Sequence, residues 1–161
     1  MATKIIEVGL TPVSEYYGSE VMLHYPGLYA GSTDLVCLHN DLETIVDFKQ
    51  ANRPKKEEWI QDYYLQIAAY AMAHDYVYKS EIKQGVVMVC TPDLYYQEFK
   101  VSGADLRSYK HKFLKRLDMY HELKFDTKEN IIKQGDLESL LKEMQANVEV
   151  DPKESNEKRK T

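Results

Sequence analysis

A long segment with helical spacing lies between two groups of strand-like segments, and this order restricts the chain to a small set of folds. From about Trp59 to Tyr78, apolar residues recur with the period of an amphipathic helix. A helix of this length between strands usually crosses over from one strand to the next and covers one face of their sheet. We therefore expect an α/β fold in which helices flank a mixed central sheet.

Five strand-like segments accompany this helix. Three precede it, are separated by turn-forming residues, and are expected to form an antiparallel meander. Two follow it, and the first of these is a continuous apolar run that suits a strand covered on both faces. The five segments span residues 19–25, 28–39, 42–49, 86–91 and 95–101.

Two further helices are expected after the strands. Residues 102–123 show helical spacing, and a shorter helix is expected at 137–146. The core order is therefore βββαββα. We assign residues 1–125 to this core and 126–146 to a helical extension. Residues 147–161 are charged and nearly free of apolar side chains, so a disordered tail is expected there.

The composition indicates an ordinary soluble protein. Hydrophobic residues make up 43% of the chain and charged residues 29%, and no apolar run reaches the roughly 20 residues of a membrane span. Because no signal peptide is evident, we expect a cytoplasmic protein with no membrane partner. Cys37 and Cys90 lie in separate apolar runs and are expected to be buried. An iron–sulfur cluster is excluded because it needs four cysteines.

Two aspartates and a lysine form a candidate site. Residues two apart in a strand point to the same face, so Asp47 and Lys49 project together while Phe48 packs on the opposite face. Asp34 lies on the preceding strand and is expected to stand near Asp47. Two carboxylates this close repel each other unless a cation neutralises them. One or two carboxylates, completed by water and phosphate, are the usual protein ligands of Mg²⁺, and Lys49 can then stabilise developing negative charge.

Polar and basic side chains are expected around this site. Gln66 and Tyr70 lie four residues apart on the long helix, so they share one face and can offer neutral hydrogen bonds to a phosphate or a metal-bound water. Arg53, Lys55 and Lys56 follow the third strand directly. They are placed to receive a nucleic-acid backbone.

The charge distribution does not decide the role of a second basic region, residues 100–124. The net charge of -5 argues mildly against a nucleic-acid partner. Residues 100–124, however, hold seven basic residues against three acidic ones, a local charge of +4. Lys110, Lys112, Lys115 and Arg116 either contact DNA or form a solvated helix face.

Taken in order, these motifs resemble those of a known enzyme family. They are G-x-x-D within residues 29–36, D-x-K within 45–49 and Q-x-x-x-Y within 65–70. The series is similar to that of the RecB-like PD-(D/E)XK nucleases, which include the mitochondrial genome-maintenance exonuclease and its phage-encoded relatives. The similarity extends over roughly residues 20–123.

The resemblance implies a metal-dependent exonuclease that hydrolyses phosphodiester bonds at single-stranded DNA ends, in phage or bacterial DNA processing or recombination. A phage-encoded protein would work in the cytoplasm of its bacterial host. The implied site comprises Mg²⁺ or Mn²⁺ held by Asp34, Asp47 and the Phe48 carbonyl, a catalytic Lys49, and Gln66 and Tyr70 as supports for DNA binding.

The N-terminal part departs from this family. Relatives have a helical lobe before the first strand, with a further acidic or histidine residue near the metal, whereas this chain is expected to begin almost at the sheet. No residue before Glu20 matches that lobe, and Glu20 stands where relatives often have a glutamate with a structural role. Either the enzyme is minimal, or a second polypeptide or subunit supplies the lobe.

Each motif alone has a simpler interpretation. D-x-K is also the pattern of a surface salt bridge, G-x-x-D of a strand bend, and Q-x-x-x-Y of ordinary helix packing. Their combination in this order favours a nuclease site. Two alternatives stay open: an endonuclease of restriction or junction-resolving type, and a non-catalytic DNA-binding subunit.

Overall fold

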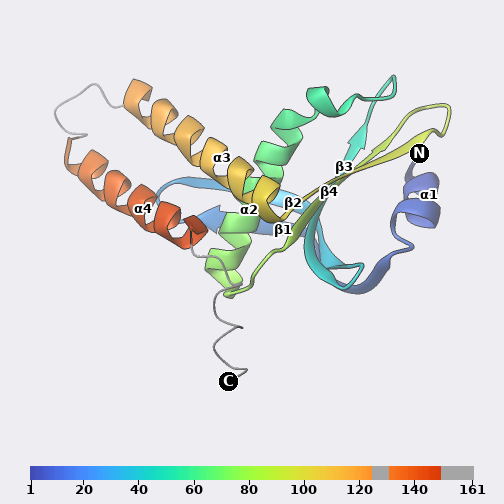
Figure 1. The fold of residues 1–161 in the computed structure, drawn as a ribbon, viewed down its shortest axis with the longest axis horizontal. Coiled ribbons are helices and arrows are strands. Elements are labelled where there is room, and N and C mark those ends of the chain that lie inside the picture. The colour runs from blue at the N-terminus through green and yellow to red at the C-terminus, as the bar shows by residue number, and fades with distance from the viewer. Residues whose placement is uncertain (125–130, 150–161) are drawn as a thin grey trace. The chain divides into compact units, whose positions relative to one another are not determined.

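The structure is a computed structural model that describes residues 1–124 and 131–149. It divides into two compact units, Met1–Phe113 and Leu114–Thr161. The first unit contains the whole sheet and the helix that crosses over it (Figure 1). The boundary predicted at residue 125 lies outside the described residues.

Five strands form one mixed sheet in the order β1-β2-β3-β4-β5. β3 and β4 are parallel, and every other neighbouring pair is antiparallel. The predicted α/β class and the core order βββαββα are thereby confirmed. The first strand starts earlier than predicted. The strands are β1 (Val13–Tyr25), β2 (Tyr29–His39), β3 (Leu42–Gln50), β4 (Gln84–Cys90) and β5 (Tyr96–Ser102).

The helix α2 (Gln61–Tyr78) connects the parallel strands β3 and β4, as the helical spacing predicts. It begins two residues later than expected because Trp59 ends a separate 3₁₀ turn, η2 (Glu57–Trp59). Ile60 and Ile67 are fully buried in the main core, which α2 forms with one face of the sheet. This packing fixes the helix against the strands that carry the candidate site.

A short helical segment precedes β1 and was not predicted from the sequence. It consists of α1 (Ala2–Lys4) and the π-helical η1 (Ile5–Gly9). Ile5 is buried in a second apolar cluster together with Val46 and Val86, whereas Ile45 and Val87 belong to the main core. Because adjacent strand residues point to opposite faces, η1 and α2 cover opposite faces of the sheet. Both cysteines are free and buried in the second cluster, as expected.

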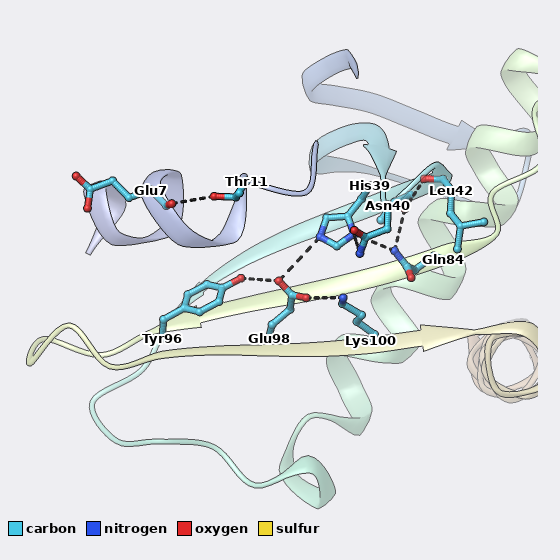
Figure 2. A network of polar contacts seen from close by, with 10 residues as sticks. Glu7, Thr11, His39, Asn40, Leu42, Gln84, Tyr96, Glu98 and Lys100 are labelled. Atoms are coloured by element: carbon cyan, nitrogen blue, oxygen red, sulfur yellow. Dashed lines mark hydrogen bonds and ion pairs between the residues drawn. The ribbon is translucent and has the colours of Figure 1, made fainter. Parts of the chain in front are cut away.

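A polar network around His39 joins β2, β4 and β5 (Figure 2). His39 lies two residues after Cys37 of the second cluster, so it shares the face of that cluster. His39 is fully buried, and its Nδ1 lies 3.2 Å from Gln84 Nε2. Its Nε2 lies 3.9 Å from a carboxylate oxygen of Glu98, which also accepts a hydrogen bond from Tyr96 at 2.8 Å. The other Glu98 oxygen pairs with Lys100 at 2.8 Å. Burial lowers the pKa of His39, so the folded chain favours the neutral ring.

The last two helices are α3 (Gly103–Lys124) and α4 (Ile131–Glu149). The latter is longer than the predicted 137–146 and includes the first three residues of the predicted tail; residues 150–161 lie outside the described part. None of the helices described is long and apolar enough to cross a membrane. In the second unit, buried apolar side chains recur at helical spacing: Leu114, Leu117, Leu137, Leu141, Met144 and Val148.

Candidate active site

Asp34 and Asp47 stand opposite each other on neighbouring antiparallel strands. The turn between β2 and β3 consists of Asn40 and Asp41, both with left-handed φ values of 48° and 61°. Such two-residue turns match the twist of a hairpin and fix its register. Here His39 pairs with Leu42, and the pairing continues as far as Leu35 and Val46. The next residue on each strand, in the direction away from the turn, is an aspartate.

The surroundings of the two aspartates differ. Asp47 is only 3% exposed, whereas Asp34 is half-buried. Oδ2 of Asp34 accepts a hydrogen bond from the Phe48 backbone N–H at 2.7 Å. The Phe48 ring itself packs against the second cluster on the far face of the sheet, as alternation predicts. The structure thus brings both carboxylates to one place on the α2 face.

Lys49 is held directly beside Asp47. Its Nζ lies 2.8 Å from Asp47 Oδ2 and 3.0 Å from Oδ1. From α2, Gln66 Oε1 accepts a further hydrogen bond from Nζ at 3.3 Å, and the Tyr63 ring centroid lies 5.1 Å away. The ammonium therefore has a defined position between β3 and α2, and one quarter of the side chain remains exposed.

Burial has the largest influence on the pKa of Asp47. It raises the pKa of this carboxyl to about 6, because the charged form loses hydration. Lys49 lowers the pKa through its hydrogen bond and charge, and Asp34 raises it again through its own charge and contact. The electrostatic influence of Asp34 agrees with the strand register that puts the two carboxylates side by side.

Gln66 and Tyr70 extend the site along α2. Gln66 Nε2 donates to the Tyr70 hydroxyl at 2.9 Å while Oε1 accepts from Lys49. The Tyr70 ring lies against Gly31, where a Cβ atom would come within 2.7 Å of Cε1. A continuous series of contacts therefore joins the G-x-x-D, Q-x-x-x-Y and D-x-K motifs. Gln66 fixes the amine, a role that the sequence did not indicate.

The basic loop follows β3 as expected. Arg53 and Lys56 are exposed, and Lys55 is half-buried. The backbone of Lys55 is held by Gln97 of β5, which accepts its N–H at 2.7 Å and donates to its carbonyl at 2.9 Å. In the other basic region, Lys110 pairs with Asp75 at 3.4 Å and is only 14% exposed. Lys112, Lys115 and Arg116 are exposed.

Glu20 is exposed on β1 and has a left-handed φ of 50°. It lies between the strand pairs Ser19–Leu35 and Val21–Thr33, and is therefore level with Asp34. Left-handed backbone is unusual for a residue other than glycine and often marks a bend or a functional site. Its structural role stays a prediction.

The donor set fits a hard divalent cation. Asp47 Oδ2 is buried and makes no hydrogen bond with any described residue, since its 2.8 Å contact with Lys49 is an ion pair without hydrogen-bond geometry. Within the described part of the chain, no three His, Cys, Asp or Glu side chains gather as metal ligands. Two carboxylates completed by water and phosphate suit Mg²⁺ or Mn²⁺. They do not suit structural zinc, which takes four protein ligands.

Comparisons with known proteins add little to this geometry. No family model matches the chain, and neither does any curated protein. Among solved structures, it is similar to an alkaline exonuclease (LHK-Exo) from Laribacter hongkongensis, with 14% sequence identity and a TM-score of 0.36. The match covers 74% of this chain and 63% of that one, less than two thirds of its length. A similarity this low carries no argument about function.

Proposed function

We propose that this chain is a metal-dependent nuclease that hydrolyses phosphodiester bonds of DNA at the site formed by Asp34, Asp47 and Lys49. One observation carries the proposal: the buried Asp47 lies opposite Asp34 in the strand register and 2.8 Å from the Lys49 amine. Two carboxylates on one sheet face can hold a divalent cation for phosphodiester hydrolysis, and the ammonium beside them can stabilise developing negative charge.

Asp34, Asp47 and the Phe48 carbonyl would hold Mg²⁺ or Mn²⁺. When bound, such a cation polarises the scissile phosphate and lowers the pKa of a coordinated water. The chain's own contribution is to keep the two carboxylates together. The Phe48 N–H fixes Asp34 by a 2.7 Å hydrogen bond, and burial fixes Asp47.

Lys49 would stabilise the negative charge that grows on the phosphate oxygens in the transition state. Its hydrogen bonds to Asp47 and Gln66 hold the ammonium in place before substrate arrives. A donor that is already oriented stabilises developing charge without the cost of reorganisation. Gln66 is therefore a positioning residue that acts through Lys49, and Tyr70 supports Gln66.

The substrate would be DNA with a free single-stranded end, bound through its phosphates by Arg53, Lys55 and Lys56. The support for this is the position of the loop, directly after the strand that carries Asp47 and Lys49. If the lobe of related enzymes comes from a second polypeptide or subunit, that partner would guide the strand toward the site.

The test uses end-labelled single-stranded DNA with the wild-type protein, with Mg²⁺ or with a chelator. We expect cleavage only with Mg²⁺ or Mn²⁺. Asp47→Asn and Lys49→Ala should each lower the rate by at least about 10²- to 10³-fold. Full activity of both variants would disprove the site.

A matched control is available in the same unit. Asp75 and Lys110 form a second half-buried aspartate–lysine pair, with atoms 3.4 Å apart. Asp75→Asn should keep Mg²⁺-dependent cleavage, provided that circular dichroism shows a folded protein. A loss equal to that of Asp47→Asn would mean that the assay reports folding.

Circular single-stranded DNA tests the exonuclease part of the proposal. An enzyme that needs ends leaves circles intact, and cleavage of circles would instead identify an endonuclease. DNA binding without any cleavage in either metal would identify a non-catalytic subunit.

A further inference from the structure

An exposed tryptophan stands at the start of the helix that borders the candidate site. Trp59 is the single tryptophan of the chain, and 57% of it is exposed. The backbone N–H of Trp59 donates to the Lys56 carbonyl at 2.9 Å, which closes the turn η2. The next residue, Ile60, is fully buried in the main core. The backbone that carries the exposed indole is therefore anchored on both sides.

An exposed aromatic side chain alone needs no explanation, but the neighbours of Trp59 lead to the site. Tyr63 follows four residues later, in the first turn of α2. Its ring lies 5.1 Å from Lys49 Nζ. Gln66 and Tyr70 follow Tyr63 at helical spacing and make the contacts described above. Trp59 thus stands only four residues before a side chain that contacts the candidate catalytic amine.

A positively charged lysine lies beside the indole ring. Lys56 Nζ lies 5.4 Å from the Trp59 ring centroid, and the lysine side chain is 70% exposed. Glu58, in the same turn, has a carboxylate oxygen 4.0 Å from Lys56 Nζ. Gln97 anchors the backbone of Lys55 through two hydrogen bonds. A rigid basic loop beside an exposed ring combines phosphate attraction with a stacking surface, the combination by which proteins bind single-stranded nucleic acid.

We propose that Trp59 stacks on an unpaired base of the substrate while a nearby phosphodiester of the same strand lies at Asp34 and Asp47. The inference rests on the proposed nuclease function and adds a base-stacking residue for its single-stranded substrate. A base inside a duplex is covered on both faces by its neighbours, so it offers the indole no surface. We therefore expect duplex DNA to bind more weakly than single-stranded DNA of the same length.

The sole tryptophan makes the contact directly observable. The wild-type protein, kept inactive with a chelator at low salt, is titrated with oligothymidylate while tryptophan fluorescence is recorded. The anisotropy of the same oligonucleotide with a fluorescent label gives an independent binding curve. We expect the fluorescence to be quenched along the same curve. An oligonucleotide of equal length without bases should bind more weakly and quench little.

Variants separate stacking from general binding. Trp59→Ala should weaken binding of oligothymidylate about 5- to 150-fold and raise KM for single-stranded DNA, while affinity for the baseless strand stays unchanged. Trp59→Phe keeps an aromatic ring and should restore most of the affinity. Tyr17→Ala is the matched control, because Tyr17 is 51% exposed but lies near Glu15 and Glu43, toward the other end of the strands.

The two proposals fail in different ways. Binding and Mg²⁺-dependent cleavage without fluorescence quenching overturn the stacking proposal and leave the nuclease intact. Equal losses for the baseless strand and for oligothymidylate in Trp59→Ala also overturn it. If the labelled oligonucleotide neither binds nor is cleaved, the proposed function fails, and the stacking proposal fails with it.

Discussion

The ring of Tyr70 occupies the space that a side chain at Gly31 would need. A Cβ atom on Gly31 would lie 2.7 Å from Tyr70 Cε1 and 3.2 Å from its hydroxyl oxygen. The φ angle of Gly31 is not left-handed, unlike those of Gly27 and Gly103. The glycine of the G-x-x-D motif is therefore explained by the close approach of α2 and not by backbone conformation.

Gly31→Ala should reduce activity through a residue that touches no substrate. The added methyl group must displace the Tyr70 ring, whose hydroxyl accepts a hydrogen bond from Gln66, and Gln66 in turn accepts one from Lys49. We expect a stability loss of about 1–3 kcal/mol from overpacking. We also expect kcat to fall by up to roughly 10²-fold because the amine is misplaced, with a smaller change in KM. Steady-state kinetics and urea unfolding measure the two effects.

Gly18→Ala is the matched control for this substitution. A Cβ atom on Gly18 would meet Val21 Cγ2 at the same 2.7 Å, but it would have no atom of Tyr70, Gln66 or Lys49 within 4 Å. Its stability loss should be comparable while kcat is preserved. If both glycine variants lose the same fraction of activity, the proposed connection through Tyr70 is wrong.

Asp47 supplies a prediction about metal affinity and pH. Burial raises its pKa to about 6 in the metal-free protein. Below that pH the carboxyl is protonated and must lose its proton before it can bind a cation. The apparent Kd for Mn²⁺ should therefore weaken by about tenfold between about pH 7 and about pH 5. Calorimetric titration of the metal-free protein measures this change.

An aspartate with the ordinary value of 3.8 would stay ionised over that whole range. Constant affinity down to about pH 5 would thus contradict the predicted burial effect. Asp75→Asn serves as the control, since Asp75 has a pKa raised by burial but pairs with Lys110. The variant should show the same pH dependence of Mn²⁺ binding as the wild type.

Local rules predict the part of the site that lies within one strand. Alternation alone puts Asp47 and Lys49 on one face and Phe48 on the other, and the structure has this arrangement. The position of Asp34 follows once the Asn40–Asp41 turn is recognised as a two-residue hairpin, because the loop length sets the register. These relationships are local, so the residue order carries them.

Contacts between distant elements could not be predicted in this way. The hydrogen bond between Gln66 and Lys49, 17 residues apart, depends on how α2 packs on the sheet. The η1 segment was missed because five residues are too short for a periodic signal, although Ile5 is buried. The exposure of Trp59 was missed because its spacing matches the buried face of α2, whereas the chain forms a separate turn there.

His39 provides a test of stability on the opposite face of the sheet. Burial lowers its pKa below the ordinary 6.5; Lys100 lowers it further, while Glu98 opposes the shift. The unfolded chain therefore takes up the proton at a higher pH than the folded chain does. The free energy of unfolding should be largest above pH 6.5 and should fall as pH drops through that value.

His39→Gln should remove this contribution and flatten the decline in stability on the acidic side. Burial also lowers the pKa of His74, which acts in the same direction, while the raised pKa values of Asp47 and Asp75 act oppositely. All three groups remain in the variant, so the difference between its curve and that of the wild type isolates His39. Urea unfolding at several pH values gives both curves, with the exposed His24→Gln as control. Only a group whose pKa differs between the folded and unfolded states changes the slope of stability against pH. If the curves of the wild type and of His39→Gln run parallel from neutral pH to about pH 5, the pKa of His39 is therefore not lowered by folding.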